Sequence, residues 1–425
     1  MGKYLERAKE IDVYGSFDVV IVGGGCAGFT AAIAAARNGA KTLIIEQFSY
    51  FGGTATASLM ANINGFRNQI KPDELQTTKG IGEEVILKLK KINGIGRSPY
   101  AAASVHNDVK DDLSYAFAID TEKFKYITLK MVKEAGVHIL FHTYFSDVIM
   151  EGEKVVGIII ENKSGRQAVY GKVVMDASGD GDVAYRAGVP FWQTKHDENN
   201  RLDDCLMYKV SGYSNPEEIN GCEYKGTMVL WGPTPGPGNG ADGEELTEEE
   251  IKVRLSVFDD LETKKKETPA LKGAKIIDTG VLIGVRQTRF IEGLYKITAD
   301  DVIEGKSFED SIAMGSSPII HYYGYRRHLN HVGYEIPYRC LLPQKVDGLI
   351  VAGRCMSSEQ QAYESWRGMA HVLAIGEGAG TAAALAVKNN VQPKELDIKM
   401  LQNQLVKQGA EIGQGKKSLE RSSAL

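Results

Sequence analysis

The sequence predicts an α/β fold because strand-like apolar runs pass directly into glycine-rich turns and helix-like segments. The apolar run at residues 17–22 is followed by Gly-Gly-Gly-Cys-Ala-Gly, then by an alanine-rich segment over 29–37 and a second apolar run over 42–45. This order is typical of two parallel strands joined by a helix. Two later segments, 173–182 and 347–354, repeat the apolar run that enters a glycine turn. We therefore expect one α/β domain assembled from separated parts of the chain.

The first glycine turn has the spacing of a dinucleotide-binding loop. Its glycines match the pattern G-x-G-x-x-G, which allows the tight turn, the approach of a pyrophosphate to the backbone and close packing of the helix. Glu46 follows about 20 residues later, where a carboxylate accepts hydrogen bonds from ribose hydroxyls. We expect a dinucleotide here, and a glycine-rich packing turn is the alternative. The predicted contacts in the loop are Gly23, Gly25, Cys26, Ala27 and Gly28.

A second glycine turn indicates which dinucleotide is bound. Residues 51–56 read Phe-Gly-Gly-Thr-Ala-Thr and follow Glu46 almost directly. Small residues at this place let a bulky ring system lie against the backbone, which a nicotinamide enzyme would not require. The segments 173–182 and 347–354 point the same way, so the sequence favours a flavin.

With these motifs in order, the chain resembles the FAD-dependent oxidoreductase family, within the two-dinucleotide-binding-domain flavoproteins of the glutathione reductase and fumarate reductase type. The family reads Gly-Gly-Gly-x-Ala-Gly, Gly-Gly-x-x-Thr, Asp-Ala-(Ser/Thr)-Gly-Asp-Gly-Asp and Ala-Gly-Arg. This sequence supplies the four motifs at 23–28, 52–56, 176–182 and 352–354. Four ordered motifs are far more specific than one. The matching segments are residues 17–60, 118–190 and 276–390.

The resemblance implies an extended, non-covalent FAD. Its adenosine would lie at Glu46, its pyrophosphate over residues 23–28, and its isoalloxazine near residues 52–53 and the segment after Arg367. A small-residue helix over 372–388 would point its N-terminus at the flavin, where the helix dipole stabilises negative charge on the reduced ring. Close packing of this helix through Gly376, Gly378 and Gly380 is the other interpretation. The further predicted cofactor contacts are Gly52, Gly53, Thr54, Gly179, Asp180, Gly353, Arg354, Gly368 and Met369.

The predicted organisation is a Rossmann-like FAD-binding domain, discontinuous in sequence, with an inserted α+β substrate domain. The FAD-binding domain comprises residues 1–61, 117–187 and 343–425, and the substrate domain comprises 62–116 and 188–342. Residues 154–174 are expected to form an antiparallel meander. The Pro/Gly-rich segment 231–243 must be a loop, either a surface insertion or a mobile lid, and Thr247 is expected to cap the helix after it.

The composition limits which classes of binding partner are expected. The 425 residues carry 50 basic and 55 acidic side chains, a net charge of −5, which gives no reason to expect a nucleic acid or an anionic membrane as partner. We expect a small-molecule substrate and no membrane-spanning segment. The N-terminus has alternating charge and no leader peptide, so a cytoplasmic location is expected. The oligomeric state is not predicted.

The cysteines predict neither a dithiol nor a metal site. Cys26, Cys205, Cys222, Cys340 and Cys355 are widely spaced and include no Cys-x-x-Cys pair. Cys26 is expected to fill space in the glycine turn. Cys355 is interpreted as a packing residue, with a redox or covalent-flavin role as the alternative.

Catalytic candidates come from segments that resemble the flavin-facing parts of the family. Residues 285–289 and 319–323 are such segments, and the start of the 372–388 helix is a third. A guanidinium can orient a substrate carboxylate, and a histidine can exchange the proton that accompanies hydride transfer. Each of these residues could equally be structural. The candidates are Arg286, Arg289, His321, Arg367 and His371.

The sequence thus predicts an enzyme that transfers hydride between flavin N5 and a small organic substrate held between two domains. No second strand-like run that enters a glycine fingerprint and a helix is expected, so no dedicated NAD(P)H domain is expected. Two alternatives stay open. One is an FAD-binding protein without net redox turnover, either a scaffold or an isomerase. The other is a thiazole-synthase-like protein in which Cys205 is consumed.

Overall fold

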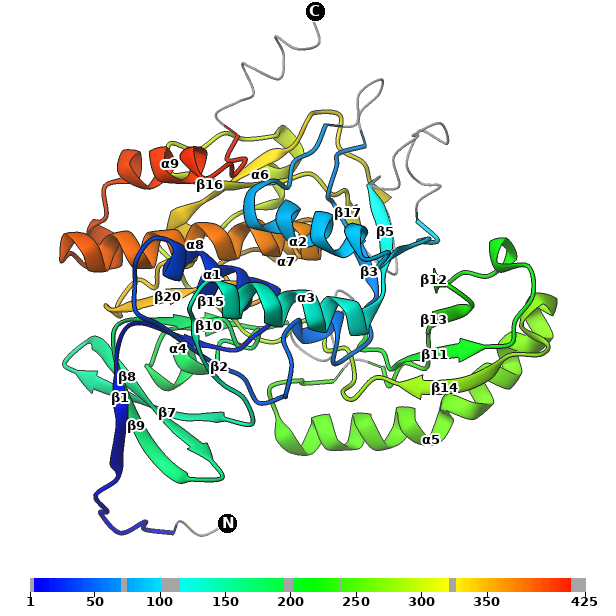
Figure 1. The fold of residues 1–425 in the computed structure, drawn as a ribbon, viewed down its shortest axis with the longest axis horizontal. Helices are drawn as coiled ribbons and strands as arrows, with labels where there is room; N and C mark the ends of the chain where they lie inside the picture. Colours follow the sequence, from blue (N-terminus) through cyan, green and yellow to red (C-terminus); the bar gives the residue numbers. More distant parts are fainter. Residues whose placement is uncertain are drawn as a thin grey trace, which may run out of the picture.

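The computed structural model describes residues 4–69, 75–100, 115–194, 202–236, 238–320 and 326–413. Its main element is a seven-stranded sheet in the order β6-β2-β1-β9-β8-β7, with β20 also paired to β9 (Figure 1). These strands are β1 (Asp12–Val22), β2 (Thr42–Ile45), β6 (His138–Leu140), β7 (Tyr144–Glu151), β8 (Lys154–Asn162), β9 (Gly165–Asp176) and β20 (Leu349–Val351).

The parallel part of this sheet brings distant segments together at one edge. β1 runs parallel to β2 and β9, and β20 runs parallel to β9. Their last residues pair directly, since Val22 is opposite both Ile45 and Asp176, and Val351 is also opposite Asp176. The carboxyl ends of parallel strands are where α/β folds bind ligands. β7, β8 and the first half of β9 form an antiparallel meander, which confirms the prediction for 154–174.

Helices cover the sheet and bury its apolar face. α1 (Cys26–Arg37) packs along the central helix α8 (Met369–Asn389), which is predominantly alanine, glycine and apolar residues. A Cβ on Gly376 would lie 2.3 Å from the Ala27 carbonyl oxygen, and one on Gly380 would lie 2.1 Å from that of Ala31. The close packing predicted through these glycines is therefore confirmed, and the helix begins three residues earlier than predicted. The neighbouring helices are α2 (Gly80–Lys91), α3 (Thr121–Glu134) and α9 (Ile398–Lys407).

Helix α8 also corrects one expectation. By length and composition it could cross a membrane, although the sequence was expected to contain no such segment. Within the structure, 89% of its most apolar window is buried. That burial is typical of a core helix, and its neighbours α1 and β16 (Ser311–Gly315) supply it.

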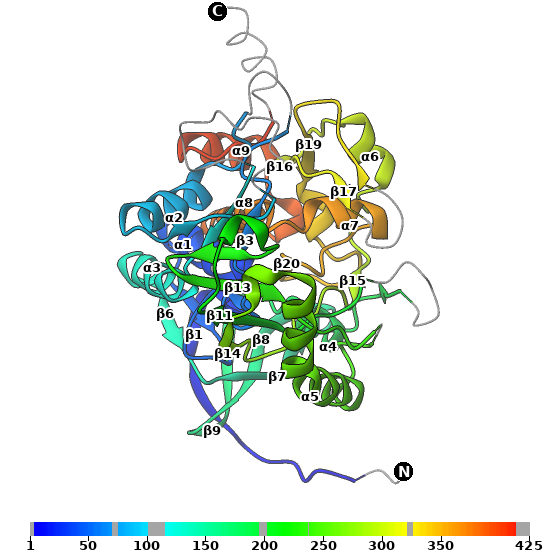
Figure 2. The same ribbon diagram turned by 90° about the vertical axis from the view of Figure 1, so that its right-hand side faces the viewer.

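A second layer lies beside the main body and has its own core (Figures 1 and 2). It is an antiparallel sheet in the order β12-β13-β11-β14, covered by the long helix α5 (Gly243–Glu267). Val253, Val257 and Leu261 of α5 pack against Tyr208 and Leu230 of the sheet. The strands are β11 (Met207–Ser211), β12 (Cys222–Tyr224), β13 (Thr227–Trp231) and β14 (Lys275–Thr279).

The cap of α5 differs from the prediction. Asp242 caps the helix, because its carboxylate accepts hydrogen bonds from the Glu244 and Glu245 N–H groups at 3.0 Å each. The prediction that Thr247 would be the cap was wrong. Thr247 lies within the first turns, and its hydroxyl donates back to the Gly243 carbonyl. An aspartate placed before two glutamates satisfies the free N–H groups of the helix start equally well.

The remaining elements connect these layers. The predicted domain division stays a prediction. Ile312 and Tyr334, from the segment assigned to the substrate domain, lie in the same hydrophobic core as residues of α1 and α8. The short helices are α4 (Asp182–Arg186), α6 (Ala299–Glu304) and α7 (Gln360–Trp366), with 3₁₀ turns η1 (Gly53–Ala55), η3 (Pro216–Glu218), η4 (Pro269–Leu271), η5 (Tyr338–Leu341) and η6 (Pro393–Glu395). The short strands are β3 (Asn62–Asn64), β4 (Ile95–Gly96), β5 (Ala116–Ile119), β10 (Phe191–Trp192), β15 (Phe290–Ile291), β17 (Ile319–Ile320), β18 (Arg326–Arg327) and β19 (Tyr334–Pro337).

Candidate active site

The glycine loop after β1 has the steric constraints that its spacing predicts. Gly23 has φ +97°, and a Cβ there would lie 2.5 Å from the Ala177 carbonyl oxygen. A Cβ on Gly28 would lie 1.9 Å from the Gly23 carbonyl oxygen, so both positions exclude every other residue. Gly25 is different, because its φ is −65° and the nearest atom to a Cβ would be the Gly53 Cα at 3.9 Å. Here glycine leaves room at the loop surface.

The loop ends at a helix N-terminus that is open to an anion. Gly25 is the N-cap of α1, and no side chain in the described part of the chain caps that helix. The first turn of α1 carries no acidic residue, so its N–H groups and the positive end of its dipole are available. The second glycine turn lies against this loop, because the Gly52 N–H donates to the Gly24 carbonyl at 2.9 Å. Thr54, at the start of η1, is exposed.

Glu46 is buried at the end of β2, next to the glycine loop. Its carboxylate accepts hydrogen bonds from the Gly24 N–H at 2.7 Å and the Phe48 N–H at 3.0 Å. Burial raises the pKa of this carboxyl, and the backbone donors partly oppose that shift. Each carboxylate oxygen can accept further hydrogen bonds, so Glu46 can bind a ribose while it holds the loop.

Replacing Glu46 by alanine should reduce FAD retention by about tenfold or more, because the variant loses both the ribose acceptor and the loop contact. The fraction of flavin left after exhaustive dialysis measures this effect. Glu161→Ala is the matched control, since Glu161 is an exposed carboxylate on β8. Full flavin occupancy in Glu46→Ala after dialysis would contradict the assignment.

The turn after β9 is organised by a buried aspartate. Asp176 accepts hydrogen bonds from the Ser178 hydroxyl at 2.6 Å, the Ser178 N–H at 3.1 Å and the Ala184 N–H at 2.9 Å. These contacts fix the positive φ of +86° at Gly179 and present Asp180 at the sheet edge. The motif therefore first serves to shape this turn.

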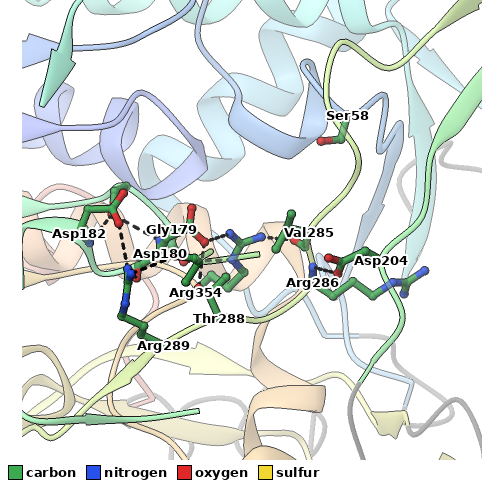
Figure 3. Close-up of polar contacts among 12 residues, drawn as sticks. Ser58, Gly179, Asp180, Asp182, Asp204, Val285, Arg286, Thr288, Arg289 and Arg354 are labelled. Atoms are coloured by element: carbon green, nitrogen blue, oxygen red, sulfur yellow. Dashed lines mark hydrogen bonds and ion pairs between the residues drawn. The ribbon is translucent and has the colours of Figure 1, made fainter. Parts of the chain in front are cut away.

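Arg354 ties three segments together beside the glycine loops (Figure 3). Its guanidinium donates to the Asp180 carboxylate, to the Gly179 carbonyl at 3.0 Å and to the Val285 carbonyl. The preceding Gly353 has φ +108°, and a Cβ there would lie 3.3 Å from the Ala27 Cβ. Arg354 thus links the end of β20 and the β9 turn to the loop that leads from the second layer. Its predicted contact with FAD stays a prediction.

The start of α8 lies on the same side as the start of α1. Gly376 packs against Ala27 and Gly380 against Ala31, so the two helices run in the same direction. Met369 therefore precedes the level of the α1 N-terminus by about two helical turns, or roughly 10 Å. Gly368 is the N-cap of α8, and Met369, its first residue, is buried. The two N-termini are therefore offset along the shared direction of the two helices.

Polar groups surround the start of α8. A Cβ on Gly368 would lie 3.1 Å from the Asn64 carbonyl oxygen, which places β3 beside the helix start. The side-chain amide of Asn62 donates from Nδ2 to the Asn64 side chain at 2.7 Å. The side-chain oxygen Oδ1 of Asn62 has no hydrogen-bond partner in the described part of the chain. The same holds for Nε of Arg367, directly before Gly368. Buried unpartnered polar atoms at a helix start are consistent with a site for a polar ligand.

His371, a predicted catalytic residue, is fully buried in the first turn of α8. The Ser316 N–H donates to its Nε2 at 3.1 Å, so the neutral ring carries its proton on Nδ1. Burial lowers the pKa of His371 to about 4. These contacts give it a structural role at the helix start, and its catalytic role stays a prediction.

The structure does not bring the other predicted catalytic residues together at one place. Arg289 pairs with Asp182 at 2.9 Å, donates to the Asp180 carbonyl and lies over the Tyr185 ring (Figure 3). Arg286 is buried, and its N–H donates to the Asp204 carboxylate at 2.8 Å. Figure 3 shows its side chain directed away from the Arg354 cluster. His321 lies outside the described residues.

Sequence reasoning missed a set of buried and half-buried polar residues between the second layer and α7. The Gln360 amide donates to the Gln287 side chain at 2.7 Å and to Glu364 at 3.3 Å, and it accepts from Thr194. Thr288 donates to Asp180 at 2.8 Å. These residues come from separate segments and have no shared spacing, so no local signal identifies them. Asp204 belongs to the same region.

All five cysteines are free and buried. Cys26 contacts the Gly52 carbonyl, and burial raises the pKa of its thiol to about 12. Cys355 is fully buried near Gly181, and burial raises the pKa of its thiol well above the ordinary value. Such thiols are poor nucleophiles, which favours the interpretation of both cysteines as packing residues.

Three features together define a dinucleotide-binding flavoprotein of the α/β type. They are the glycine loops at the carboxyl edge of a parallel sheet, the acidic residue at the end of β2, and the N-termini of two parallel helices. The family model described as FAD dependent oxidoreductase matches residues 18–229 and 215–405. The chain therefore belongs to the FAD-dependent oxidoreductase family, and it is an FAD-dependent enzyme. The residues present fit FAD, because the uncapped α1 N-terminus and the open Gly25 face suit a pyrophosphate and Glu46 suits a ribose.

Curated relatives match parts of the chain. The thiamine thiazole synthase of Methanococcus vannielii is 33% identical over 173 residues, 38% of this chain and 56% of the relative. Digeranylgeranylglycerophospholipid reductase 2 of Methanothermobacter thermautotrophicus is 26% identical over 223 residues, 51% of this chain and 53% of the relative. The chain thus spans about half the length of these relatives.

A solved structure is similar in fold over most of the chain. The geranylgeranyl bacteriochlorophyll reductase-like protein of Thermoplasma acidophilum superposes with a TM-score of 0.54. The match covers 93% of this chain and 84% of that protein at 18% sequence identity. At this identity the likeness establishes the fold alone.

Proposed function

We propose that the enzyme transfers hydride between FAD and a small organic substrate bound between the main sheet and the second layer. The observation that carries this proposal is the parallel packing of α1 and α8, whose N-termini are offset by roughly 10 Å along the helix direction. An extended dinucleotide with its pyrophosphate at α1 would bring its redox ring to α8. The polar residues between the layers would then border the substrate.

FAD supplies hydride chemistry at N5. The protein supplies the surroundings. The start of α8 favours negative charge next to it, because its dipole and free N–H groups point there. Arg367, whose buried Nε has no hydrogen-bond partner in the described part of the chain, would orient an anionic or carbonyl group. The Arg354 cluster holds the loop from the second layer against the β9 turn. The proton that accompanies hydride transfer is assigned to His321.

An anaerobic titration tests the proposal. Bleaching of the flavin spectrum by a substrate would support net redox turnover, and the sequence leaves alcohols, sugars, amines and activated double bonds to be screened. A spectrum that stays oxidised with every compound tried would favour the scaffold or isomerase alternative.

His321→Ala should lower the rate of flavin reduction about 100-fold, the typical contribution of a general acid or base. Stopped-flow absorbance measures this rate. His328→Ala is the control, because His328 is exposed and bonds Gln69. Unchanged reduction kinetics in His321→Ala, with a normal flavin spectrum, would remove His321 from the mechanism.

A thiazole-synthase-like activity is the second candidate, favoured by the matches to thiamine thiazole synthases. It would consume Cys205, whose thiol is buried and contacts the Gly232 carbonyl at 3.4 Å. Burial raises the pKa of this thiol, which makes it a poor nucleophile in this arrangement. Intact-mass analysis after turnover distinguishes the two functions, because loss of sulfur at Cys205 would support this candidate over hydride transfer.

A further inference from the structure

Strand β3 runs past the start of helix α8. A Cβ on Gly65, directly after the strand, would lie 2.4 Å from Nε2 of His371 in the first turn of the helix. A Cβ on Gly368, the N-cap, would lie 3.1 Å from the Asn64 carbonyl oxygen. The chain therefore advances along the helix direction from Asn64 to Gly65. Each strand residue spans about 3.3 Å, so Asn62, two residues before Asn64, lies ahead of the helix start.

The side chain of Asn62 is buried there with one acceptor unused. Asn62 is 5% exposed. Its Nδ2 donates to the Asn64 side chain at 2.7 Å, which fixes the orientation of the amide. Its Oδ1 has no hydrogen-bond partner among the residues that the structure describes. Buried acceptors are rarely left unpaired in native proteins, so this oxygen indicates a ligand that donates a hydrogen bond.

Hydrogen-bond donors lie at the same helix start. No side chain within the described ranges caps α8, and its first turn carries no acidic residue, so the N–H groups of that turn are free. Arg367 directly precedes the N-cap, and its buried Nε–H is also unpartnered there. Its guanidinium lies 5.8 Å from the centre of the Tyr363 ring. The start of α8 thus offers donors from two sources and one acceptor.

The pyrimidine ring of a flavin has a complementary edge. Its N3–H group lies between the carbonyl oxygens O2 and O4, so the edge presents one donor flanked by two acceptors. Asn62 supplies the one acceptor, and Arg367 and the first turn of α8 supply the donors. A carboxylate of a substrate would leave Oδ1 of Asn62 without a donor. The pattern therefore favours the ring edge over a substrate anion at this place.

We propose that Asn62 accepts a hydrogen bond from N3–H of the FAD pyrimidine ring, while Arg367 and the first turn of α8 donate to the carbonyl oxygens on either side. This inference rests on the proposed function, which brings the redox ring to α8. Asn62 then acts as a positioning residue, because one acceptor between donors admits the ring edge in a single orientation. Arg367 favours the reduced ring, since its positive charge stabilises the negative charge that reduction adds.

An FAD analogue with a methyl group on N3 tests the Asn62 contact, because the analogue lacks the N3–H donor. Fluorescence titration of the apoprotein gives the dissociation constants of FAD and of the analogue. The wild type should bind the analogue at least about tenfold more weakly, the effect of one lost hydrogen bond to a buried acceptor. This comparison requires no variant.

Asn62→Ala should lose this discrimination, because the acceptor that distinguishes the two flavins is gone. Its dissociation constants for FAD and the analogue should agree within about threefold. Asn38→Ala is the matched control, since the Asn38 amide bonds the Ala34 carbonyl and Gln408 at the far end of α1. This control should discriminate as the wild type does. Thermal unfolding of the apoproteins shows whether both variants fold.

Arg367→Gln tests the charge beside the ring. Relative to oxidised FAD, this variant should bind reduced FAD about tenfold more weakly than the wild type does, which lowers the midpoint potential by about 30 mV. Arg37→Gln is the control, because Arg37 pairs with Glu84 at the far end of α1, and it should keep the wild-type potential. An unchanged potential in Arg367→Gln would overturn the Arg367 contact.

A wild type that binds the two flavins equally would overturn the proposal, and so would a discrimination that Asn62→Ala retains. The anaerobic titration separates this failure from a failure of the proposed reaction. Flavin bleaching by a substrate, without discrimination between the two flavins, would keep the reaction and remove the Asn62 contact. Discrimination with a spectrum that stays oxidised would keep the contact and remove only the reaction.

Discussion

Replacing Gly25 by alanine should abolish FAD retention while the apoprotein stays folded. The φ of −65° suits alanine, and the nearest atom to the new Cβ is 3.9 Å away, so the protein itself tolerates the methyl group. The second glycine of the fingerprint is where a pyrophosphate approaches the backbone. Loss of one or two charge-assisted hydrogen bonds predicts a dissociation constant for FAD that is about 100-fold higher.

Gly28→Ala is the matched comparison. Its Cβ would lie 1.9 Å from the Gly23 carbonyl oxygen, inside the protein, so this variant should lose stability even without FAD. Overpacking of this kind costs about 1–3 kcal/mol. Flavin fluorescence titration measures binding, and thermal unfolding of the apoproteins measures stability. If Gly25→Ala binds FAD as tightly as the wild type does, the pyrophosphate does not lie over this loop.

The second large effect is a pair of opposite pH dependences on helix α8. His371 is fully buried, and burial lowers its pKa to about 4, below the ordinary value of about 6.5. Between these values the unfolded chain binds more protons than the folded one. The free energy of unfolding therefore decreases as the pH falls from about 6.5 to 4, by at most about 3 kcal/mol.

Glu377, two turns further along α8, acts in the opposite direction. It is buried beside the α2 N-terminus, where it accepts hydrogen bonds from the Ile81 N–H at 2.7 Å and the Gln408 amide at 2.8 Å. It borders a cavity of about 180 Å³ there. Burial raises its pKa to about 7. The folded state then binds more protons between pH 4.5 and 7, so this contribution is lost as the pH rises, again by at most about 3 kcal/mol.

Single variants should reveal the two contributions. In Glu377→Gln the His371 term remains, and the free energy of unfolding should fall more steeply than in the wild type as the pH is lowered from 6.5 to 4.5. In His371→Gln the Glu377 term remains, and the free energy of unfolding should increase relative to the wild type over the same range. Urea unfolding of the apoproteins measures both. Curves of both variants that run parallel to the wild type would contradict the assigned protonation states.

The spacing of the glycine fingerprint could be predicted because Gly28 is excluded from other residue types by the carbonyl of Gly23, five residues before it. Gly23 is constrained as well by Ala177, which the sheet brings next to it from a distant part of the sequence. The strand–helix–strand unit with Glu46 is likewise a short continuous segment. The same holds for the meander at 154–174, whose alternation and turn lie in one stretch. Such patterns act through the backbone and its nearest neighbours, so the sequence displays them directly.

The surroundings of the site could not be predicted in the same way. Arg354 bonds Asp180 and Val285, which are far from it in sequence, and Asp204 meets Arg286 only because the second layer folds back. The cap of α5 was misassigned because Asp242 and Thr247 are both good capping residues and packing selects between them.

The glycine spacing and the alternation of strand-like and helix-like segments predicted the α/β fold, and four ordered motifs carried the resemblance to the FAD-dependent oxidoreductase family. The packing of the layers shows which candidate residues are occupied by other contacts, such as Arg289 on Asp182 and the buried His371 on Ser316. Whether a charged side chain is free for a ligand depends on the burial and partners supplied by distant segments, and these exist only after the layers have packed.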